Sequence, residues 1–188
     1  MTNIKRPNLI LTEADMSQAV SHKLGKYAAK EIRINGCIFD VVAYDRKEQL
    51  FRVVECKRSS KASTIGHAFG QLATYKATIA AQGRIFLDVY SKRINMRLGR
   101  WMEATNTYRR IRIAFYVALT DKACKRLDLI RSLKESLPEV GIIRVKSNGL
   151  CRSYLRVGSQ RNEEISRAHP ITVRILPADS GGPSNAAE

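Results

Sequence analysis

The sequence predicts an α/β fold, in which helices flank a mixed β-sheet. Apolar residues recur at three- and four-residue spacing over 12–30 and 64–81, which is typical of amphipathic helices. Between them, residues 32–56 form short apolar runs separated by turn signals, among them the hairpin-forming pair Asn35-Gly36. The later run 111–119 (IRIAFYVAL) is strongly strand-like. Together these segments predict a helix and an antiparallel meander, then a central helix and further strands of the same sheet.

The individual elements follow from the same patterns. Thr12 with Asp15 resembles a helix start, so the first helix is expected from Thr12 to Lys30. Gly83 is expected to end the second helix. Strands are expected at 32–34, 37–44, 50–56, 84–90, 111–119, 142–145 and 150–157, and further helices at 91–104 and 121–137. We expect one domain over 1–176 and a disordered tail over 177–188, whose composition cannot form a core.

The charge is unusual for a chain of 188 residues. Lys and Arg number 33 against 17 Asp and Glu, giving a net charge of +16 and a pI near 10.1. Such a field attracts nucleic acids and anionic membranes. No segment approaches the roughly 18–20 consecutive apolar residues of a membrane span, and the N-terminal residues do not resemble a signal peptide. We therefore expect a cytoplasmic protein with a broad basic surface that binds nucleic acid.

The cysteines do not indicate a metal site. They stand at positions 37, 56, 124 and 151, without CxxC spacing or neighbouring histidines. Zinc and iron–sulfur sites need ligands that converge, and this spacing offers none. We expect Cys37 and Cys56, which fall inside apolar strand-like runs, to be buried free thiols, as is usual in a reducing compartment.

Two predicted strands contain charged residues that do not suit a buried sheet. Asp40 interrupts an apolar strand, and Glu55 with Lys57 stands at the end of the next one. Residues i and i+2 of a strand share a face, so Glu55 and Lys57 are neighbours. Two carboxylates on adjacent strands repel each other unless a cation lies between them, and oxygen ligands suit Mg²⁺ or Mn²⁺. The alternative is a buried salt bridge of Lys57 with either acid; we favour the metal site.

The second helix adds a polar stripe, because His67, Gln71 and Tyr75 are each four residues apart. Gln71 and Tyr75 can hydrogen-bond a phosphate, a water or the Glu55 carboxylate. The alternative is an ordinary amphipathic helix with Tyr75 in the core and Gln71 in solvent.

This order of parts resembles the PD-(D/E)XK nuclease superfamily, which has the restriction-endonuclease-like fold. The resemblance rests on a helix, a strand with Asp40, the sequence Glu55-Cys56-Lys57 at a strand end, and a helix with Gln71 and Tyr75. The Gln-xxx-Tyr element is similar to that of the RecB-like and Holliday-junction-resolvase-like branches. One position departs from the family pattern, since the residue before Asp40 is Phe39 and not Pro.

The resemblance implies a role for each matching residue. Asp40 and Glu55 would coordinate Mg²⁺ or Mn²⁺, with the main-chain carbonyl of Cys56 and with Glu13 on the first helix as further ligands. Lys57 would orient or activate the attacking water and stabilise charge on the phosphorane. Gln71 would position a water or phosphate, with Tyr75 in support. The implied activity is that of a Mg²⁺-dependent DNA endonuclease.

Exposed cations would hold the substrate backbone without recognising its sequence. The residues expected to bind nucleic acid are Arg58, Lys61, Lys92, Arg93, Arg97, Arg100, Arg109 and Arg110. Trp101 and Tyr108 lie among them and could stack on bases, although core packing is favoured for Trp101. The alternatives left open are a catalytically silent nucleic-acid-binding module, an RNA-directed nuclease, and an interaction protein in which the motif is fortuitous. Whether the chain acts as a homodimer is also left open.

Overall fold

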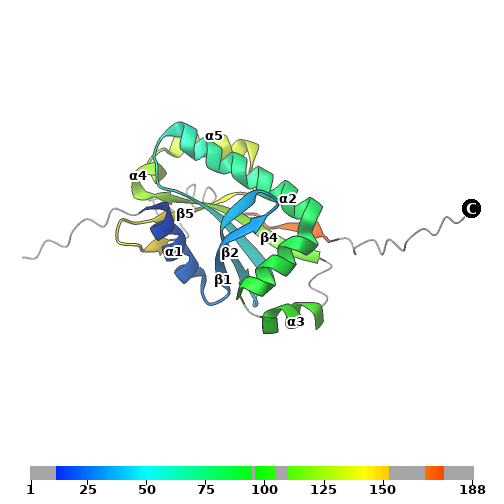
Figure 1. The fold of residues 1–188 in the computed structure, drawn as a ribbon. Helices are drawn as coiled ribbons and strands as arrows, with labels where there is room; N and C mark the ends of the chain where they lie inside the picture. The colour runs from blue at the N-terminus through cyan, green and yellow to red at the C-terminus, as the bar shows by residue number, and fades with distance from the viewer. Residues whose placement is uncertain (1–11, 95, 105–109, 153–167, 176–188) are drawn as a thin grey trace, which may run out of the picture.

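The computed structural model describes residues 12–94, 96–104, 110–152 and 168–175, which fold around one mixed β-sheet (Figure 1). The first part of the chain forms α1 (Glu13–Leu24), β1 (Ala28–Ile34), β2 (Cys37–Asp45), β3 (Leu50–Lys57), α2 (Ala62–Ile94) and α3 (Met96–Ala104). The second part forms β4 (Arg110–Thr120), α4 (Asp121–Cys124), α5 (Leu127–Ser136), β5 (Gly141–Val145), β6 (Cys151–Arg152) and β7 (Ile171–Arg174). The prediction of an α/β fold with a mixed sheet and flanking helices is confirmed.

The strand order of the sheet is β1-β2-β3-β4-β5-β6, and β7 also pairs with β4. Strands β1, β2 and β3 form the predicted antiparallel meander. The long helix α2 and the shorter α3 then lead to β4, which lies parallel to β3 and to β5. This crossover makes the sheet mixed, and it puts the carboxyl ends of β3 and β4 at the same edge, where Lys57 is paired with Leu119.

Two hydrophobic layers cover the two faces of the sheet. On one face, Met16 and Val20 of α1 pack with Val54 and Cys56 of β3. On the other face, α2 crosses the sheet and joins α3 and α5 in a larger core (Figure 1). Phe51 and Val53 of β3 point into that larger core. Because side chains alternate along a strand, Glu55 and Lys57 continue on the face of α2.

Local signals in the sequence explain two boundaries well. Thr12 caps α1: its hydroxyl accepts from the Asp15 amide, and the Asp15 carboxylate accepts from the Thr12 amide. Asn35 and Gly36 join β1 to β2 with φ angles of 43° and 82°. Two consecutive positive φ angles are what a two-residue hairpin turn requires, and this pair of residues adopts them readily.

The predicted strand over 84–90 is wrong, because these residues belong to α2. Gly83 does not end the helix; the backbone leaves helical geometry only at Gln82, with φ −132° and ψ 33°, and the helix then resumes. A Cβ on residue 83 would lie 2.6 Å from Cδ1 of Ile175, so this glycine permits close packing. Phe86 and Tyr90, four residues apart, are both fully buried, which is a helical period within an apparently continuous apolar run.

Other boundaries also differ from the prediction. The first helix ends at Leu24 and not at Lys30, because Gly25 takes a positive φ of 93° and β1 begins at Ala28. The helix expected over 121–137 is divided into α4 and α5. Of the strand expected over 150–157, Cys151–Arg152 forms β6 and Leu150 lies before it. Residues 153–157 lie outside the described residues, as does the predicted tail over 177–188. The helix expected over 91–104 corresponds to the end of α2 and to α3.

The cysteines agree with the sequence-based expectation only in part. All four are free; Cys56 is buried as expected, as is Cys124, whereas Cys37 is only partly buried, like Cys151. None of the described helices combines the length and the apolar character that crossing a membrane requires.

We predict that Gly141→Ala destabilises the fold. An added Cβ would lie 2.7 Å from the Tyr116 ring and 2.8 Å from the backbone nitrogen of Ala168. Overpacking of this kind costs about 1–3 kcal/mol, which urea denaturation would measure. Gly70→Ala is the matched control, because its Cβ would meet nothing within 4 Å and an exposed helical alanine is favoured by about 1 kcal/mol. Equal stability of the two variants would contradict this packing.

Candidate active site

The candidate site lies where β2 and β3 stop pairing. Their register runs from Asp45 opposite Leu50 to Val41 opposite Val54 and ends there. The pairing of β1 with β2 is also interrupted beside Asp40, because the register passes from Lys30–Val41 to Ile32–Phe39 without pairing the residues between them. The unpaired residue of β1, Glu31, has a positive φ of 53°. Irregularities of this kind redirect side chains, and they are common beside active sites.

Strands β1 and β2 both change face at this irregularity. Phe39, Val42 and Tyr44 of β2 all contribute to the core on the α2 side. Strict alternation would have put Phe39 on the opposite face from Val42. The irregularity therefore places Phe39 under α2 and leaves Asp40 between β2 and β3, instead of on a regular face of the sheet.

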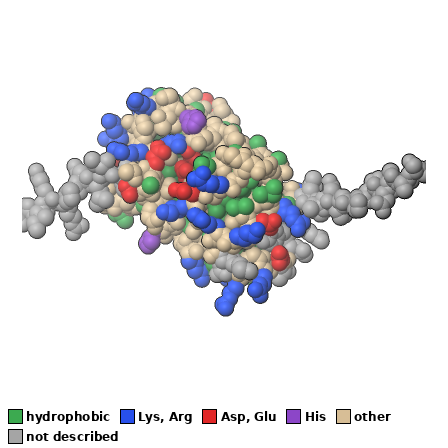
Figure 2. All heavy atoms as spheres, in the orientation of Figure 1, with side chains coloured by type: hydrophobic (Ala, Val, Ile, Leu, Met, Phe, Trp, Pro, Cys, Tyr) green, Lys and Arg blue, Asp and Glu red, His purple; other side chains and the backbone are tan. Residues whose placement is uncertain are grey.

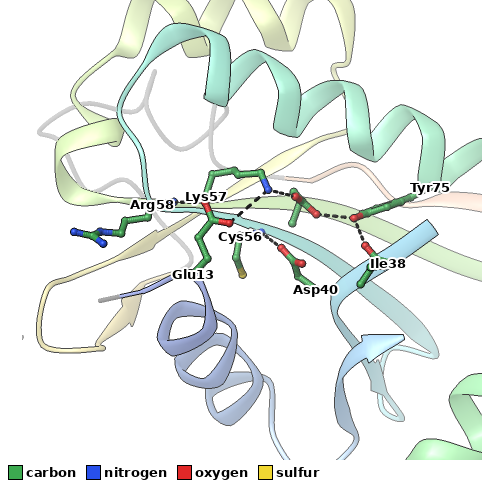
Figure 3. A network of polar contacts seen from close by, with 8 residues as sticks. Glu13, Ile38, Asp40, Cys56, Lys57, Arg58 and Tyr75 are labelled. Atoms are coloured by element: carbon green, nitrogen blue, oxygen red, sulfur yellow. Dashed lines mark hydrogen bonds and ion pairs between the residues drawn. The ribbon is translucent and has the colours of Figure 1, made fainter. Parts of the chain in front are cut away.

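Asp40 closes the gap between the two strands with its side chain. Its Oδ2 accepts a hydrogen bond of 2.8 Å from the backbone amide of Cys56 (Figure 3). The side chain of one strand thereby replaces a backbone pairing with the other. This contact brings the Asp40 carboxylate next to the residues at the end of β3.

Glu55, Lys57 and Glu13 meet at that end. Oε1 of Glu55 lies 2.6 Å from Nζ of Lys57, and Nζ is also 3.7 Å from Oε2 of Glu13 (Figure 3). The first contact is an ion pair without ideal hydrogen-bond alignment, since Oε1 receives no well-directed donor among the described residues. Glu13 also accepts from the Arg58 amide at 3.4 Å. Glu55 is 1% exposed, Lys57 14% and Glu13 49%, so the group is open to solvent on the Glu13 side.

Tyr75 connects α2 to both strands. Its hydroxyl contacts Oε2 of Glu55 at 2.7 Å and hydrogen-bonds the Ile38 carbonyl of β2 (Figure 3). Its ring stacks on Phe39, with 4.4 Å between the ring centroids. A phenol has one proton, so the Glu55 carboxylate and the Ile38 carbonyl share it as acceptors. Tyr75 is thus a core residue and a partner of Glu55 at the same time.

The electrostatics of the group reflect two acids close together. Burial, and next the charge of Asp40, raise the pKa of Glu55 to about 7 despite the neighbouring Lys57. Burial also raises the pKa of Asp40, and the Cys56 amide offsets this only in part. Burial alone would lower the pKa of Lys57, but the contact with Glu55 and the charges of the three nearby acids together outweigh burial, and the pKa is raised. Lys57 is therefore a cation at neutral pH, and it cannot act there as a general base.

The rest of the predicted polar stripe is divided between the interior and the surface. Gln71 is partly buried one turn before Tyr75, and its Oε1 is buried without a hydrogen-bond partner among the described residues. Gln71 is therefore not the solvent-exposed residue of an ordinary amphipathic helix. Leaving its buried amide oxygen without a donor is costly. His67 is exposed.

The cations predicted to bind nucleic acid are divided between the two ends of the sheet. Arg58 and Lys61 are exposed just beyond β3, beside the acidic group. Arg110 begins β4 at the opposite end, about 30 Å from Leu119 by strand rise. Exposed residues at that opposite end include Lys92, Arg93, Arg97 and Arg100, whereas Arg109 and Tyr108 lie outside the described residues. Figure 2 shows Lys and Arg side chains over much of the visible face.

A metal ion would find few acidic ligands in this group. Within the described ranges, no cluster of three or more His, Cys, Asp and Glu side chains is arranged to hold one. Mg²⁺ often takes only one or two carboxylates and completes its shell with water and substrate phosphate. Asp40, Glu55 and the main-chain carbonyl of Cys56 fit such a sparse site, and a divalent cation would offset the burial that raises the pKa of both carboxyls.

Sequence reasoning missed two members of the site. Phe39 supports the Tyr75 ring, and the Ile38 carbonyl accepts from its hydroxyl. The available signal was the position of Phe39, directly before the buried acid, where an aromatic ring can pack against the helix. A main-chain acceptor such as that of Ile38 leaves no signal in the sequence.

Comparison with known proteins matched this chain to no protein-family model, no curated protein and no solved structure. The resemblance to PD-(D/E)XK nucleases therefore stays a prediction that rests on the site residues and on the order of the elements that hold them.

We predict that Tyr75→Phe destabilises the protein by about 1–3 kcal/mol, because Glu55 and the Ile38 carbonyl lose a buried partner while the ring stacking remains. Tyr90→Phe is the matched control on the same helix, since its buried hydroxyl bonds the Tyr27 carbonyl, away from the acids. Both variants should lose stability in urea denaturation. Because the Tyr75 hydrogen bond lowers the pKa of Glu55, only Tyr75→Phe should also extend to higher pH the range over which stability falls.

We predict that stability of the metal-free protein falls as pH rises from about 4.5 to about 7. The folded pKa of Glu55 is raised above its unfolded value, so the folded state holds the additional proton over this range. The loss attributable to Glu55 is on the order of 3 kcal/mol. Urea denaturation in EDTA at several pH values measures it, with Glu55→Gln as the comparison. Parallel pH profiles for the two proteins would refute the raised pKa.

Proposed function

We propose that this protein is a metal-dependent nuclease that hydrolyses phosphodiester bonds, with DNA as its substrate. The observation that carries the proposal is the meeting of Asp40, Glu55 and Lys57 at the end of β3. Two acids sit close enough for one to raise the pKa of the other, and a protonated amine lies 2.6 Å from one of them. A structural salt bridge would need only one acid, so the second acid supports a site for a cation.

The resemblance to PD-(D/E)XK nucleases supports the same function. Its motif residues occur on α1, β2, the end of β3 and α2, in the order on which the resemblance rests. Tyr75 of the polar stripe contacts Glu55, and Glu13, which was proposed from the resemblance alone, contacts Lys57. These contacts argue against a fortuitous motif.

Each residue has a role that its surroundings allow. A Mg²⁺ or Mn²⁺ ion held by Asp40, Glu55 and the Cys56 carbonyl would supply a Lewis acid for the phosphate and an acidified water. Lys57, cationic at neutral pH, stabilises negative charge that develops on the phosphate. Tyr75 holds the Glu55 carboxyl in place. Gln71 brings an unpaired amide oxygen that can accept a hydrogen bond from a water.

The substrate is proposed from charge. Arg58 and Lys61 beside the acids, together with the net charge of +16, suit a polyanionic backbone. One observation favours a second candidate, a catalytically silent nucleic-acid-binding module: no three-ligand metal cluster occurs in the described part of the chain. RNA as substrate is an alternative that the cleavage assays below distinguish.

We predict that Lys57→Ala and Asp40→Asn still bind DNA but lose cleavage. Removing one preorganised group that stabilises transition-state charge typically lowers kcat by about 10²–10³-fold, and loss of a metal ligand should cost at least as much. The measurement is Mg²⁺-dependent cleavage of plasmid, branched DNA, single strands and RNA, with binding followed by fluorescence anisotropy.

Arg131→Ala serves as the control, because Arg131 pairs with Asp128 on α5 and has no part in the site. Unchanged cleavage by Lys57→Ala and Asp40→Asn would refute the site. Tight binding without cleavage by the unmodified protein would favour the silent module. Calorimetry with Mn²⁺ alone provides an independent measurement, in which Asp40→Asn should lose binding.

A further inference from the structure

A second cationic surface lies at the opposite end of the sheet, around the turn between β2 and β3. The guanidinium of Arg46 lies 4.9 Å from the Trp101 ring centroid and 6.0 Å from that of Tyr27. It also donates to the Tyr27 hydroxyl at 3.3 Å. Lys26 also lies over the Tyr27 ring, with its Nζ 4.9 Å from the ring centroid. Two cations are therefore held against two aromatic rings at the surface.

These cations are not neutralised by nearby acids. Asp45, the acid next to Arg46, is occupied by Arg52 at 2.7 Å. No ion pair between described residues involves Lys26, Arg46, Lys92, Arg93 or Arg100. An exposed guanidinium fixed by aromatic rings loses little conformational freedom when it binds an anion, and its donors suit a phosphate.

Packing between elements brings the other cations to the same end. The Tyr90 hydroxyl bonds the Tyr27 carbonyl, which places the end of α2, with Lys92 and Arg93, beside this group. Trp101 belongs to α3, whose exposed residues include Arg100. We call Lys26, Arg46, Lys92, Arg93 and Arg100 the α3-end surface. Figure 2 shows Lys and Arg side chains at the end of the molecule where Figure 1 shows α3.

We infer that the α3-end surface binds the phosphate backbone of the same nucleic acid whose scissile bond lies at Asp40 and Glu55. The inference rests on the proposed function and adds a requirement for substrate length. Arg46 follows Asp40 by six residues along β2, which is about 20 Å at the rise of a strand. At 3.4 Å per base pair, a duplex must extend about six base pairs from the scissile bond to reach this surface.

The test compares DNA hairpins with stems of about 5 and about 20 base pairs, which fall short of the α3-end surface or reach it. The variants are Arg46→Gln and the double variant Lys92→Glu with Arg93→Glu, which leaves the aromatic packing intact. Arg131→Gln is the charge-matched control for Arg46→Gln, since Arg131 lies on α5, away from α3 (Figure 1). Fluorescence anisotropy in EDTA measures affinity without cleavage, and thermal melting confirms folding.

For the long stem, each lost phosphate contact should weaken binding about tenfold near 0.1 M salt and lower the salt slope by about 1. Binding of the short stem, and binding by Arg131→Gln, should not change. Equal losses for both stems, or no loss for the long stem, would overturn the inference. Parallel cleavage assays in Mg²⁺ separate the two proposals. If the protein cuts DNA but these variants do not weaken long-stem binding, only the further inference is wrong. If these variants weaken long-stem binding but the unmodified protein cuts nothing, only the proposed nuclease activity is wrong.

Discussion

The candidate site depends on the early separation of β2 from β3. If the ladder continued beyond Val41 and Val54, backbone hydrogen bonds would fill the space that Asp40 now occupies. Instead the Asp40 carboxylate accepts from the Cys56 amide, and the Tyr75 hydroxyl contacts Glu55 on one strand and the Ile38 carbonyl on the other. Every backbone group left by the broken pairing must find a partner, because buried polar groups without one are costly. The side chains that meet this need are also those proposed for the chemistry.

The charges of the site are arranged so that an additional cation would be favourable. Glu55 is nearly fully buried beside a second acid, and Lys57 alone does not return its pKa to the ordinary range. A buried pair of acids with one amine carries a net negative charge, which a stable protein core avoids. Glu13 adds a third acid on the exposed side. A sheet end selected only for stability would have no use for this excess of acids in a chain of net charge +16.

The sequence predicted most elements and singled out candidate site residues, but it could not predict how they meet. Short apolar runs bounded by turn signals located β2 and β3, and Asp40 and Glu55 were recognisable because acids interrupt apolar strands. The irregularity at Glu31 and Asp40 could not be predicted, because it depends on two strands changing face together. The strand expected over 84–90 failed for a related reason. The helical period of an apolar run is visible only when it is known which of its side chains are buried. Gly83 is required because Ile175, far away in the sequence, packs against it and leaves no room for a Cβ.

The distribution of cations follows from the path of α2. The helix begins beside the acidic group, next to Arg58 and Lys61, and crosses the whole sheet before ending near Tyr27 and Trp101. A chain with one local binding patch would gather its basic residues where the chemistry occurs. Here the crossover carries them from one end of the sheet to the other, and the helix stays packed as far as Tyr90, which is fully buried. A polyanion that follows this face would meet cations along a length that a mononucleotide could not span, which argues for a polymer as the partner of this surface.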